Sequence, residues 1–200
     1  MEKRNVYASD GEYFIREFSD EEKDNYMKLM FPENDISEFY QKEENRELFW
    51  RFARNLKEID YSIYNARGEY CGSLELKNYD TATPEIGINL LENYRNKGIA
   101  VKTIKMLAKK YYEENASIEY YALRVSSYNL HSQHVMEKLG AELAGEEETL
   151  LQKAVRILKD QMTEKNSNNS SKESPINLEL NLEEKEEVIY RFHLLPDAFL

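Results

Sequence analysis

Apolar and β-branched residues cluster or alternate along some stretches of this chain and recur every three or four positions along others. The first pattern predicts strands at Tyr13–Glu17, Tyr61–Tyr64, Tyr70–Leu76, Glu85–Leu91, Ile118–Val125, Ala141–Gly145, Ile176–Leu182 and Val188–Leu195. The second predicts helices at Ser19–Phe31, Ile36–Lys57, Gly98–Tyr112, Asn129–Leu139 and Thr149–Thr163. This order of elements indicates an α/β or α+β sheet with helices on both faces.

Residues typical of helix ends and turns mark where these elements begin and stop. Ser19 and Glu22 have the spacing of a capping box, and Pro32 ends the helix that they open. Residues 65–68 (Asn-Ala-Arg-Gly) predict a hairpin turn between two strands. Gly140 is suited to the position that follows a helix. The chain of 200 residues is therefore read as one domain.

The stretch Pro84–Tyr112 combines a strand, a glycine-bearing turn and the start of a helix. The first amides of a helix are unpaired and lie at the positive end of its dipole. Gly98 has no Cβ, so a ligand can approach its main chain closely. Residues 93–112 hold six Lys or Arg and no acid, within a chain of 27 basic and 38 acidic residues. These features predict a cradle for a phosphate or pyrophosphate group.

Overall charge and cysteine content limit the partners of the protein. A net charge of −11 argues against nucleic acid or an anionic membrane as the main partner and favours a cationic one, such as an amine. Cys71 is the only cysteine, which excludes an intramolecular disulfide and indicates a reducing compartment. No apolar run is long enough for a membrane span. We therefore expect a cytoplasmic protein.

Two motifs carry a resemblance to a known family. The first is Arg95-x-x-Gly98-x-Ala100, which follows the strand that begins at Glu85. The second is Leu123-x-Val125-x-x-x-Asn129-x-x-Ser132, followed by Val135-Met136-Glu137-Lys138-Leu139-Gly140. Together they resemble the GNAT superfamily of acyl-CoA-dependent N-acetyltransferases. The second motif is most similar to the branch that includes ribosomal-protein N-terminal acetyltransferases.

The resemblance implies a GNAT fold and a site for acetyl-CoA. Its sheet is mixed and mostly antiparallel, has about seven strands, and is splayed between the fourth and fifth strands, where coenzyme A lies. Asn129 and Ser132 would lie on the cofactor side of the following helix. Main-chain groups of Leu90 and Leu91 would pair with the pantetheine arm. The pyrophosphate would be held at the turn and helix start, by residues Arg95, Asn96, Lys97, Gly98, Ile99, Ala100, Val101 and Lys102.

Acetyl transfer to an amine is helped by a base near the nucleophile. Glu85 is the candidate base, directly or through a water, because its strand borders the acyl end of the cofactor; the alternative is a carboxylate that only binds a cation. Many family members carry a Tyr where this chain has Met136, and Met cannot donate a proton. Ser132 and Tyr128 are substitutes for that general acid. The alternative function is a non-catalytic acyl-CoA-binding module.

The remaining expectations concern the acceptor, metals and assembly. The acceptor is expected to be a small-molecule amine or a protein N-terminus. His131 and His134 lack a third ligand of the kind that a metal site requires, so no metal is expected. Residues 149–187 lie between the last two strands of the family pattern and are predicted to be an insertion with a mobile linker at 165–175. We expect this insertion to cap the acceptor site or to mediate homodimer formation.

Overall fold

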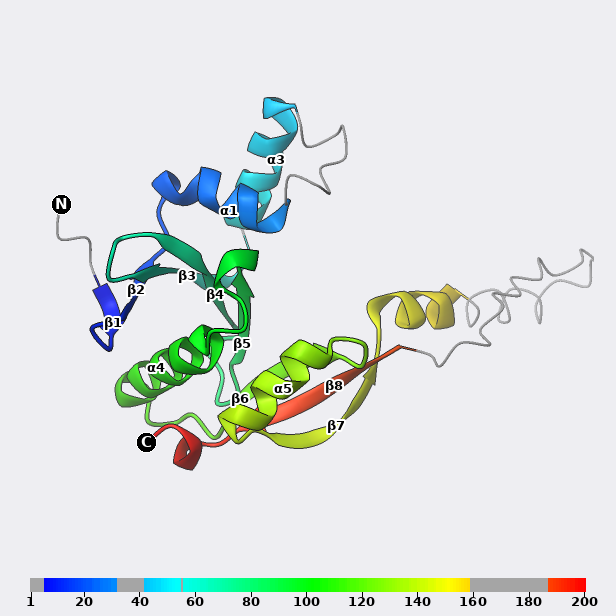
Figure 1. Cartoon of the computed structure of the whole chain (residues 1–200). Helices are drawn as coiled ribbons and strands as arrows, with labels where there is room; N and C mark the ends of the chain where they lie inside the picture. Colours follow the sequence, from blue (N-terminus) through cyan, green and yellow to red (C-terminus); the bar gives the residue numbers. More distant parts are fainter. Residues whose placement is uncertain (1–5, 32–41, 55, 159–186) are drawn as a thin grey trace, which may run out of the picture.

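The computed structural model describes residues 6–31, 42–54, 56–158 and 187–200 (Figure 1). Its strands are β1 (Val6–Ser9), β2 (Tyr13–Glu17), β3 (Glu58–Asn65), β4 (Tyr70–Lys77), β5 (Glu85–Leu90), β6 (Tyr121–Ser126), β7 (Glu142–Glu148) and β8 (Val188–Leu194). Its α-helices are α1 (Lys23–Met30), α3 (Glu43–Arg54), α4 (Ile99–Glu114) and α5 (Leu130–Leu139), and residues 150–158 are also helical. Short 3-10 turns are η1 (Asp20–Glu22), η2 (Glu92–Tyr94) and η3 (Pro196–Ala198).

The eight strands form one mixed sheet in the order β1-β2-β3-β4-β5-β6-β8-β7. Every neighbouring pair is antiparallel except β5 and β6, which run parallel. The parallel pair is in register only at Glu85 and Ala122, next to a hydrogen bond from Ala122 N to Pro84 O at 2.8 Å. Beyond this point the two strands diverge toward their carboxyl ends. The expected mixed sheet with a splay at this position is therefore present.

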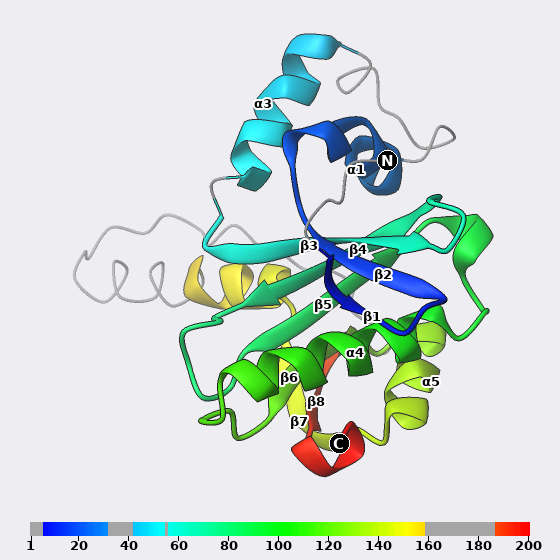
Figure 2. The ribbon, with the colours of Figure 1, turned by 90° about the vertical axis from the view of Figure 1, so that its left-hand side faces the viewer.

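Helices cover both faces of the sheet (Figure 2). Helices α4 and α5 lie on one face, where Leu74, Leu76 and Ile86 pack with α4 residues Ile104 and Leu107 in the main core. Helices α1 and α3 lie over the opposite face of the first strands, and they enclose a smaller core of Phe18, Tyr26, Met27, Trp50 and Ala53. Helix α3 buries the side that carries Trp50 and Ala53 and leaves its charged side in solvent, as is typical of an amphipathic helix.

The sequence-based expectations hold for most elements, with one strand missed. Strand β1 was not expected, so the sheet has eight strands rather than about seven, and the expected fourth and fifth strands are β5 and β6. The four residues of β1 lie at the edge of the sheet, and its outer residues are exposed. A short edge strand of this kind carries no clear alternation.

Element ends differ from expectation in a few places. Helix α3 covers Glu43–Arg54 of the predicted Ile36–Lys57, and residues 32–41 lie outside the described part of the chain. Strand β6 begins at Tyr121 rather than Ile118, because the Ile118 amide closes a turn onto Asn115 O at 3.2 Å. The helix predicted from Thr149 is present over 150–158. The predicted linker at 165–175 and the strand Ile176–Leu182 lie outside the described residues.

Among the described residues, no helix has both the length and the apolar character that crossing a lipid bilayer demands.

Candidate functional site

The diverging ends of β5 and β6 define the candidate site. Because the strands are parallel, their carboxyl ends lie at the same edge of the sheet, and the helices that follow them, α4 and α5, both begin there (Figure 1). Ligands of open α/β sheets bind in the crevice at such a point. The two motifs that carry the family resemblance, far apart in the sequence, are thus brought to one edge.

The turn between β5 and α4 has positive φ angles, which favour glycine. Gly98 precedes α4 with φ of 75°, and Asn96 has φ of 59°. Both lie in the left-handed region, which costs a residue with a side chain roughly 1 kcal/mol, with Asn more tolerant than most. A Cβ added to Gly98 would meet no atom within 4 Å. The protein therefore leaves open space in front of this glycine.

The main-chain amides of this turn are available to a ligand. The first hydrogen bond into α4 runs from Lys102 N to Gly98 O at 3.2 Å. Within the described chain, the amides of residues 96–101 donate to no backbone carbonyl. Unpaired amides at the positive end of a helix dipole are suited to an anion. The expected residues Asn96, Lys97, Gly98, Ile99, Ala100 and Val101 are therefore gathered in one cradle.

The cationic side chains near the cradle differ in the contacts that they make within the protein. The Arg95 side chain donates through Nε to Leu90 O at 3.0 Å and so braces the turn against β5. Lys102 forms an ion pair with Glu12. The Lys97 Nζ lies 5.6 Å from the centroid of the Tyr94 ring, on the exposed side of the turn. Among the described residues, Arg95 and Lys97 therefore have no ion pair with a carboxylate, and Lys97 is the one whose charged end is not held by the main chain.

Along β5, main-chain groups alternate between the two neighbouring strands. The register with β4, together with the bond from Leu91 N to Cys71 O at 3.0 Å, leaves the polar groups of Ile88 and Leu90 facing β6. Leu91 is different from what was expected, because its carbonyl also accepts from Tyr94 N at 2.9 Å. Both main-chain groups of Leu91 are therefore engaged within the protein. Ile88, which the sequence analysis did not single out, presents its amide to the splay instead.

Glu85 lies at the closed end of the splay, not at its mouth. Its side chain is 14% exposed and forms an ion pair with Arg124 of β6. Arg124 in turn contacts Glu147 of β7, with 3.4 Å between Nε and Oε2. Arg124 therefore competes with an incoming amine for the Glu85 carboxylate. This ion pair was not foreseen, because Arg124 is remote in sequence and reaches Glu85 only through the parallel pairing.

The N-terminus of α5 is capped by its own sequence. Asn129 Oδ1 accepts from Ser132 N at 3.0 Å, so the side-chain oxygen of Asn129 caps the helix, while its Nδ2 has no hydrogen-bond partner among the described residues. Met136 is 4% exposed and belongs to the main core. Tyr128, in the preceding turn, is 60% exposed. Both candidate acids, Ser132 and Tyr128, lie at the edge of the sheet where β6 ends.

Carboxylates line the face of the sheet opposite α4. Asp60 of β3 lies opposite Glu75 of β4 on this face. Glu58 of β3 and Glu85 of β5 also lie on it, on either side of Lys77 of β4. We call Glu58, Asp60, Glu75 and Glu85 the acidic strip. Burial raises the pKa of Asp60 to about 6, with further contributions from Glu58 and Glu75. Burial also raises the pKa of Glu58, and Glu75 adds to that shift.

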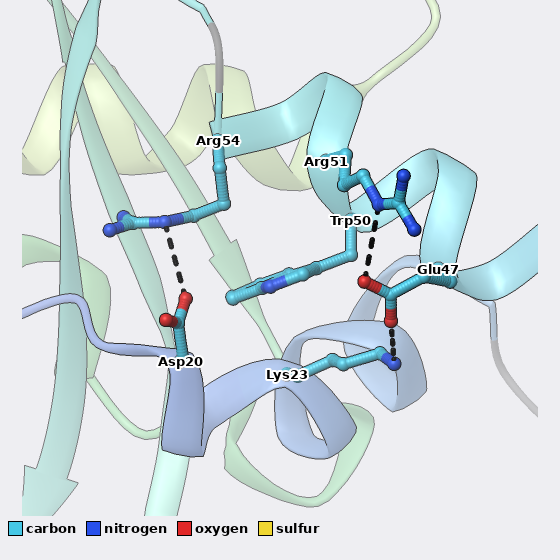
Figure 3. Close-up of a pocket in the computed structure, with 6 residues that line it drawn as sticks. All are labelled: Asp20, Lys23, Glu47, Trp50, Arg51 and Arg54. Carbon is cyan, nitrogen blue, oxygen red and sulfur yellow. Dashed lines mark hydrogen bonds and ion pairs between the residues drawn. The ribbon is translucent and has the colours of Figure 1, made fainter.

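A hollow of about 460 Å³ lies between η1, α1 and α3, beside Trp50 (Figure 3). An ion pair from Arg54 to Asp20 at 3.8 Å connects two of its walls, and another joins Arg51 to Glu47 within α3 at 3.4 Å. Lys23 also contacts Glu47, at 2.5 Å. No residue that lines the hollow belongs to either motif or to the splay, and its charged groups are paired with one another. It is therefore not the candidate site.

Other reactive side chains do not form a second centre. Cys71 is fully buried, and burial raises the pKa of its thiol to about 11, as expected of a core residue rather than a nucleophile. His134 is exposed and contacts Glu137 at 3.0 Å. In the part of the chain that the structure describes, no three His, Cys, Asp or Glu side chains are arranged to hold a metal ion.

Comparisons with known proteins agree with this geometry. No curated protein matches the sequence. Among solved structures, a mutant form of spermidine N-acetyltransferase SpeG from Vibrio cholerae has a TM-score of 0.62 at 16% identity, covering 96% of this chain and 98% of its own. The dodecameric structure of spermidine N-acetyltransferase from Vibrio cholerae in an intermediate state has a TM-score of 0.60 at 17% identity, with the same coverage. A putative acetyltransferase has a TM-score of 0.63 at 13% identity, covering 97% of this chain and 89% of its own.

The matches to solved structures support the fold. The family described as "Acetyltransferase (GNAT) domain" matches residues 7–142, which include both motifs and the whole splay. This protein belongs to the GNAT acetyltransferase family.

Proposed function

We propose that this protein transfers an acetyl group from acetyl-CoA to a primary amine of a cationic acceptor. The observation that carries the proposal is the splay of β5 and β6 with the unpaired amides of residues 96–101 at its mouth. A pyrophosphate at these amides would place the pantetheine arm along the main chain of Leu90 and Ile88. The thioester would then lie toward the closed end of the splay, near Glu85.

Acetyl-CoA supplies an activated acyl group whose carbonyl carbon the amine attacks. The new C–N bond forms as the C–S bond breaks, the amine loses a proton, and the departing thiolate gains one. The amine must be neutral, and a lysine-like amine has a pKa near 10.4, so a base assists. In this scheme Glu85, or a water beside it, takes the amine proton. The Ile88 amide polarises the carbonyl oxygen.

The proton for the thiolate has a less direct source in this chain. Met136 is buried and has no proton to donate. Coenzyme A is a good leaving group, because a free thiol has a pKa near 8.5, so modest assistance is enough. Ser132 and Tyr128 are the candidates for this role, because they lie at the edge of the sheet where β6 ends. Neither is required for the attack itself.

Calorimetric titration with acetyl-CoA and with dephospho-CoA tests the cradle. We expect both ligands to bind with micromolar affinity, because the amides at residues 96–101 would hold the pyrophosphate that the two share. Substitution Gly98→Glu should abolish binding of both by placing an anion in front of the turn. An absence of binding to the unmodified protein would refute the proposal before any acceptor is sought.

The acceptor class is the finer part of the proposal. The acidic strip and the net charge of −11 favour an amine that carries positive charge. Likeness in fold to spermidine N-acetyltransferases makes polyamines the first acceptors to test. The similarity of residues 129–140 to the ribosomal-protein branch makes a peptide N-terminus the second. Release of CoA is measured with polyamines, peptides and aminoglycosides, and no release with any of them would count against acetyl transfer.

A second candidate function is non-catalytic binding of acyl-CoA. It is favoured by Met136, which replaces the tyrosine of many family members, and by Arg124, which occupies the Glu85 carboxylate. In a binding module, Glu85→Gln would leave the affinity for acetyl-CoA unchanged and there would be no turnover to lose. In the enzyme, the same variant keeps its affinity and loses turnover.

The helical residues 150–158 support a proposed role in self-association. Leu150, Leu151 and Leu158 are exposed, and an exposed apolar helix face is an expected contact surface. We propose that residues 149–187 mediate a homodimer or cap the acceptor site. Deletion of residues 166–174 tests this, with solution mass and acetylation measured together; unchanged mass and activity would remove both roles from that linker.

A further inference from the structure

We propose that the acidic strip, Glu58, Asp60, Glu75 and Glu85, binds the second, non-reacting ammonium group of a diamine or polyamine acceptor. The inference rests on the proposed function and deepens it, because it assigns residues that select one class of amine. It concerns the face of the sheet opposite α4, where the carboxylates of three strands converge.

The register of the strands places these groups in two rows. One row runs from Asp60 on β3 through Glu75 on β4 to Gly87 on β5. The next row, one pleat away, runs from Glu58 through Lys77 to Glu85. Neighbouring strands lie about 4.8 Å apart, so the rows extend about 10 Å from β5 to β3. A cation on this face lies within reach of several carboxylates at once.

The charges of the strip are only partly balanced. Lys77 lies 2.9 Å from Glu75 and 4.0 Å from Glu58, and Arg124 pairs with Glu85. These two cations offset two of the four carboxylates. Arg54 of α3 acts on Asp60 from farther away and is itself 3.8 Å from Asp20. Asp60 is therefore the carboxylate whose charge has no direct cationic contact among the described residues.

Lys77 shows what the strip accommodates. Its ammonium lies between Glu75 and Glu58, each on a different side, and both carboxylates are largely buried, with side-chain exposures of 13% and 10%. The protein thus already holds one alkyl ammonium here. A ligand ammonium would use the same chemistry one row along, between Asp60 and Glu75.

A buried hydroxyl in the next row is without a partner. Ser62 and Ser73 face each other across β3 and β4, directly beside the row of Asp60 and Glu75. Ser73 is 1% exposed and its hydroxyl interacts with that of Tyr70, whereas Ser62 is 0% exposed and its Oγ has no hydrogen-bond partner within the described structure. A buried hydroxyl without a partner is costly. An ammonium donates three hydrogen bonds, so a ligand at Asp60 would also supply a donor to Ser62.

Gly87 lets the Glu75 carboxylate lie against the main chain of β5. A Cβ at this position would lie 3.0 Å from Glu75 Oε2. The Glu75 carboxylate is thereby one residue from Ile88, whose amide faces the splay. In the proposed arrangement, a short alkyl chain connects the amine that reacts at the splay with an ammonium held at Asp60 and Glu75.

The test compares acceptors that differ in their second charge. Values of kcat/KM are measured for n-butylamine, 1,4-diaminobutane and spermidine with the unmodified protein, Asp60→Asn and Glu75→Gln. Asp80→Asn, which changes an exposed carboxylate in the loop between β4 and β5, is the matched control. We expect both strip variants to lower kcat/KM about tenfold or more for the two polycations and less than twofold for n-butylamine. Asp80→Asn should change none of these values.

Direct calorimetric binding of spermidine to the same variants separates this inference from the proposed function. Loss of affinity in Asp60→Asn with retained affinity in Asp80→Asn supports the strip, even if no acetyl transfer is found. Equal losses for the monoamine and the polyamines would show that Asp60 acts only on the fold, and unchanged values for every amine would show that the strip binds none of them. Either result would overturn the inference. A failure of acetyl-CoA to bind would instead refute the proposed function alone.

Discussion

The two ends of β5 have opposite electrostatic character. Its carboxyl end continues into a turn with Lys97, Gly98 and unpaired amides, followed by a helix without acidic residues in its first turn. Its amino end begins at Glu85, beside the half-buried carboxylates Asp60 and Glu75. A single strand of six residues thus connects a site suited to an anion with one suited to a cation.

The difference matches what acetyl transfer to an amine requires. Coenzyme A is a polyanion, and the proposed acceptor is a cation, so one uniform surface charge would repel one of the two substrates. The net charge of −11 conceals this separation, since it averages over both ends. In the proposed reaction, charges separated along a strand would let each substrate approach from its own side and meet near the splay.

The largest effect is expected at the anion end. Gly98→Glu adds a negative charge in front of the unpaired amides and imposes a side chain on a backbone with φ of 75°. We expect a loss of at least about 100-fold in acetyl-CoA affinity by calorimetry, because both attraction and access are removed. Gly98→Ala, which strains the backbone but adds no charge, should lose far less. Equal losses would mean that strain, not charge, controls the cradle.

The next effect concerns the point where the two ends meet. Glu85→Gln removes the candidate base while keeping its size, and it also releases Arg124. We expect kcat to fall about 100-fold, with the Kd for acetyl-CoA changed less than threefold. Activity that recovers as the pH rises toward the pKa of the amine would identify the lost group as a base. A kcat close to that of the unmodified protein would instead leave Glu85 as a structural partner of Arg124.

A smaller effect is expected at the cation end, where a substitution should stabilise the protein rather than impair it. The folded state raises the pKa of Asp60 from 3.8 to about 6, so it binds this proton more tightly than the unfolded chain does. The contribution of Asp60 to stability should therefore fall as the pH rises from about 4 to about 6. Asp60→Asn removes a half-buried charge and should stabilise the protein by about 1 to 2 kcal/mol at pH 7.5, after allowing for solvent screening.

Denaturant unfolding at pH 7.5 and pH 4 measures this difference, and the gain should nearly vanish at the lower pH. The groups around Asp60 that also act on it are Glu58, Glu75, Lys77 and Arg54. Destabilisation at pH 7.5 would show that the carboxylate stabilises the fold. A more stable variant that has lost polyamine recognition would show that its charge is maintained for binding.

The smallest effect is expected at α5, the second helix that begins at the splay. Asn129→Ala removes the acceptor of Ser132 N and should destabilise the protein by about 1 kcal/mol. Its effect on acetyl-CoA binding should stay within threefold, since the cradle belongs to α4. Thermal unfolding and calorimetry on one preparation check both values. A loss of affinity as large as that of Gly98→Glu would give Asn129 a direct contact with the ligand.

Local features of the site were predictable because they depend on residues close in sequence. The turn at Arg95–Gly98, the helix that follows it and the cap formed by Asn129 all appear where their residues indicate. Helix starts, tight turns and caps need only a few consecutive side chains and their own hydrogen bonds. For the same reason the short edge strand β1 was missed, because its stability comes from pairing with β2 and not from its own pattern.

The sequence by itself determined the family, the order of most elements and the glycine turn that opens α4. Only the tertiary structure decided that Glu85 pairs with Arg124 at the closed end of the splay, and that Ile88 rather than Leu91 presents its main chain there. It also decided that Asp60 and Glu75 share one face with the unpartnered hydroxyl of Ser62. These groups are distant in sequence, and strand register alone brings them together, because a shift of one residue would turn every one of them to the opposite face.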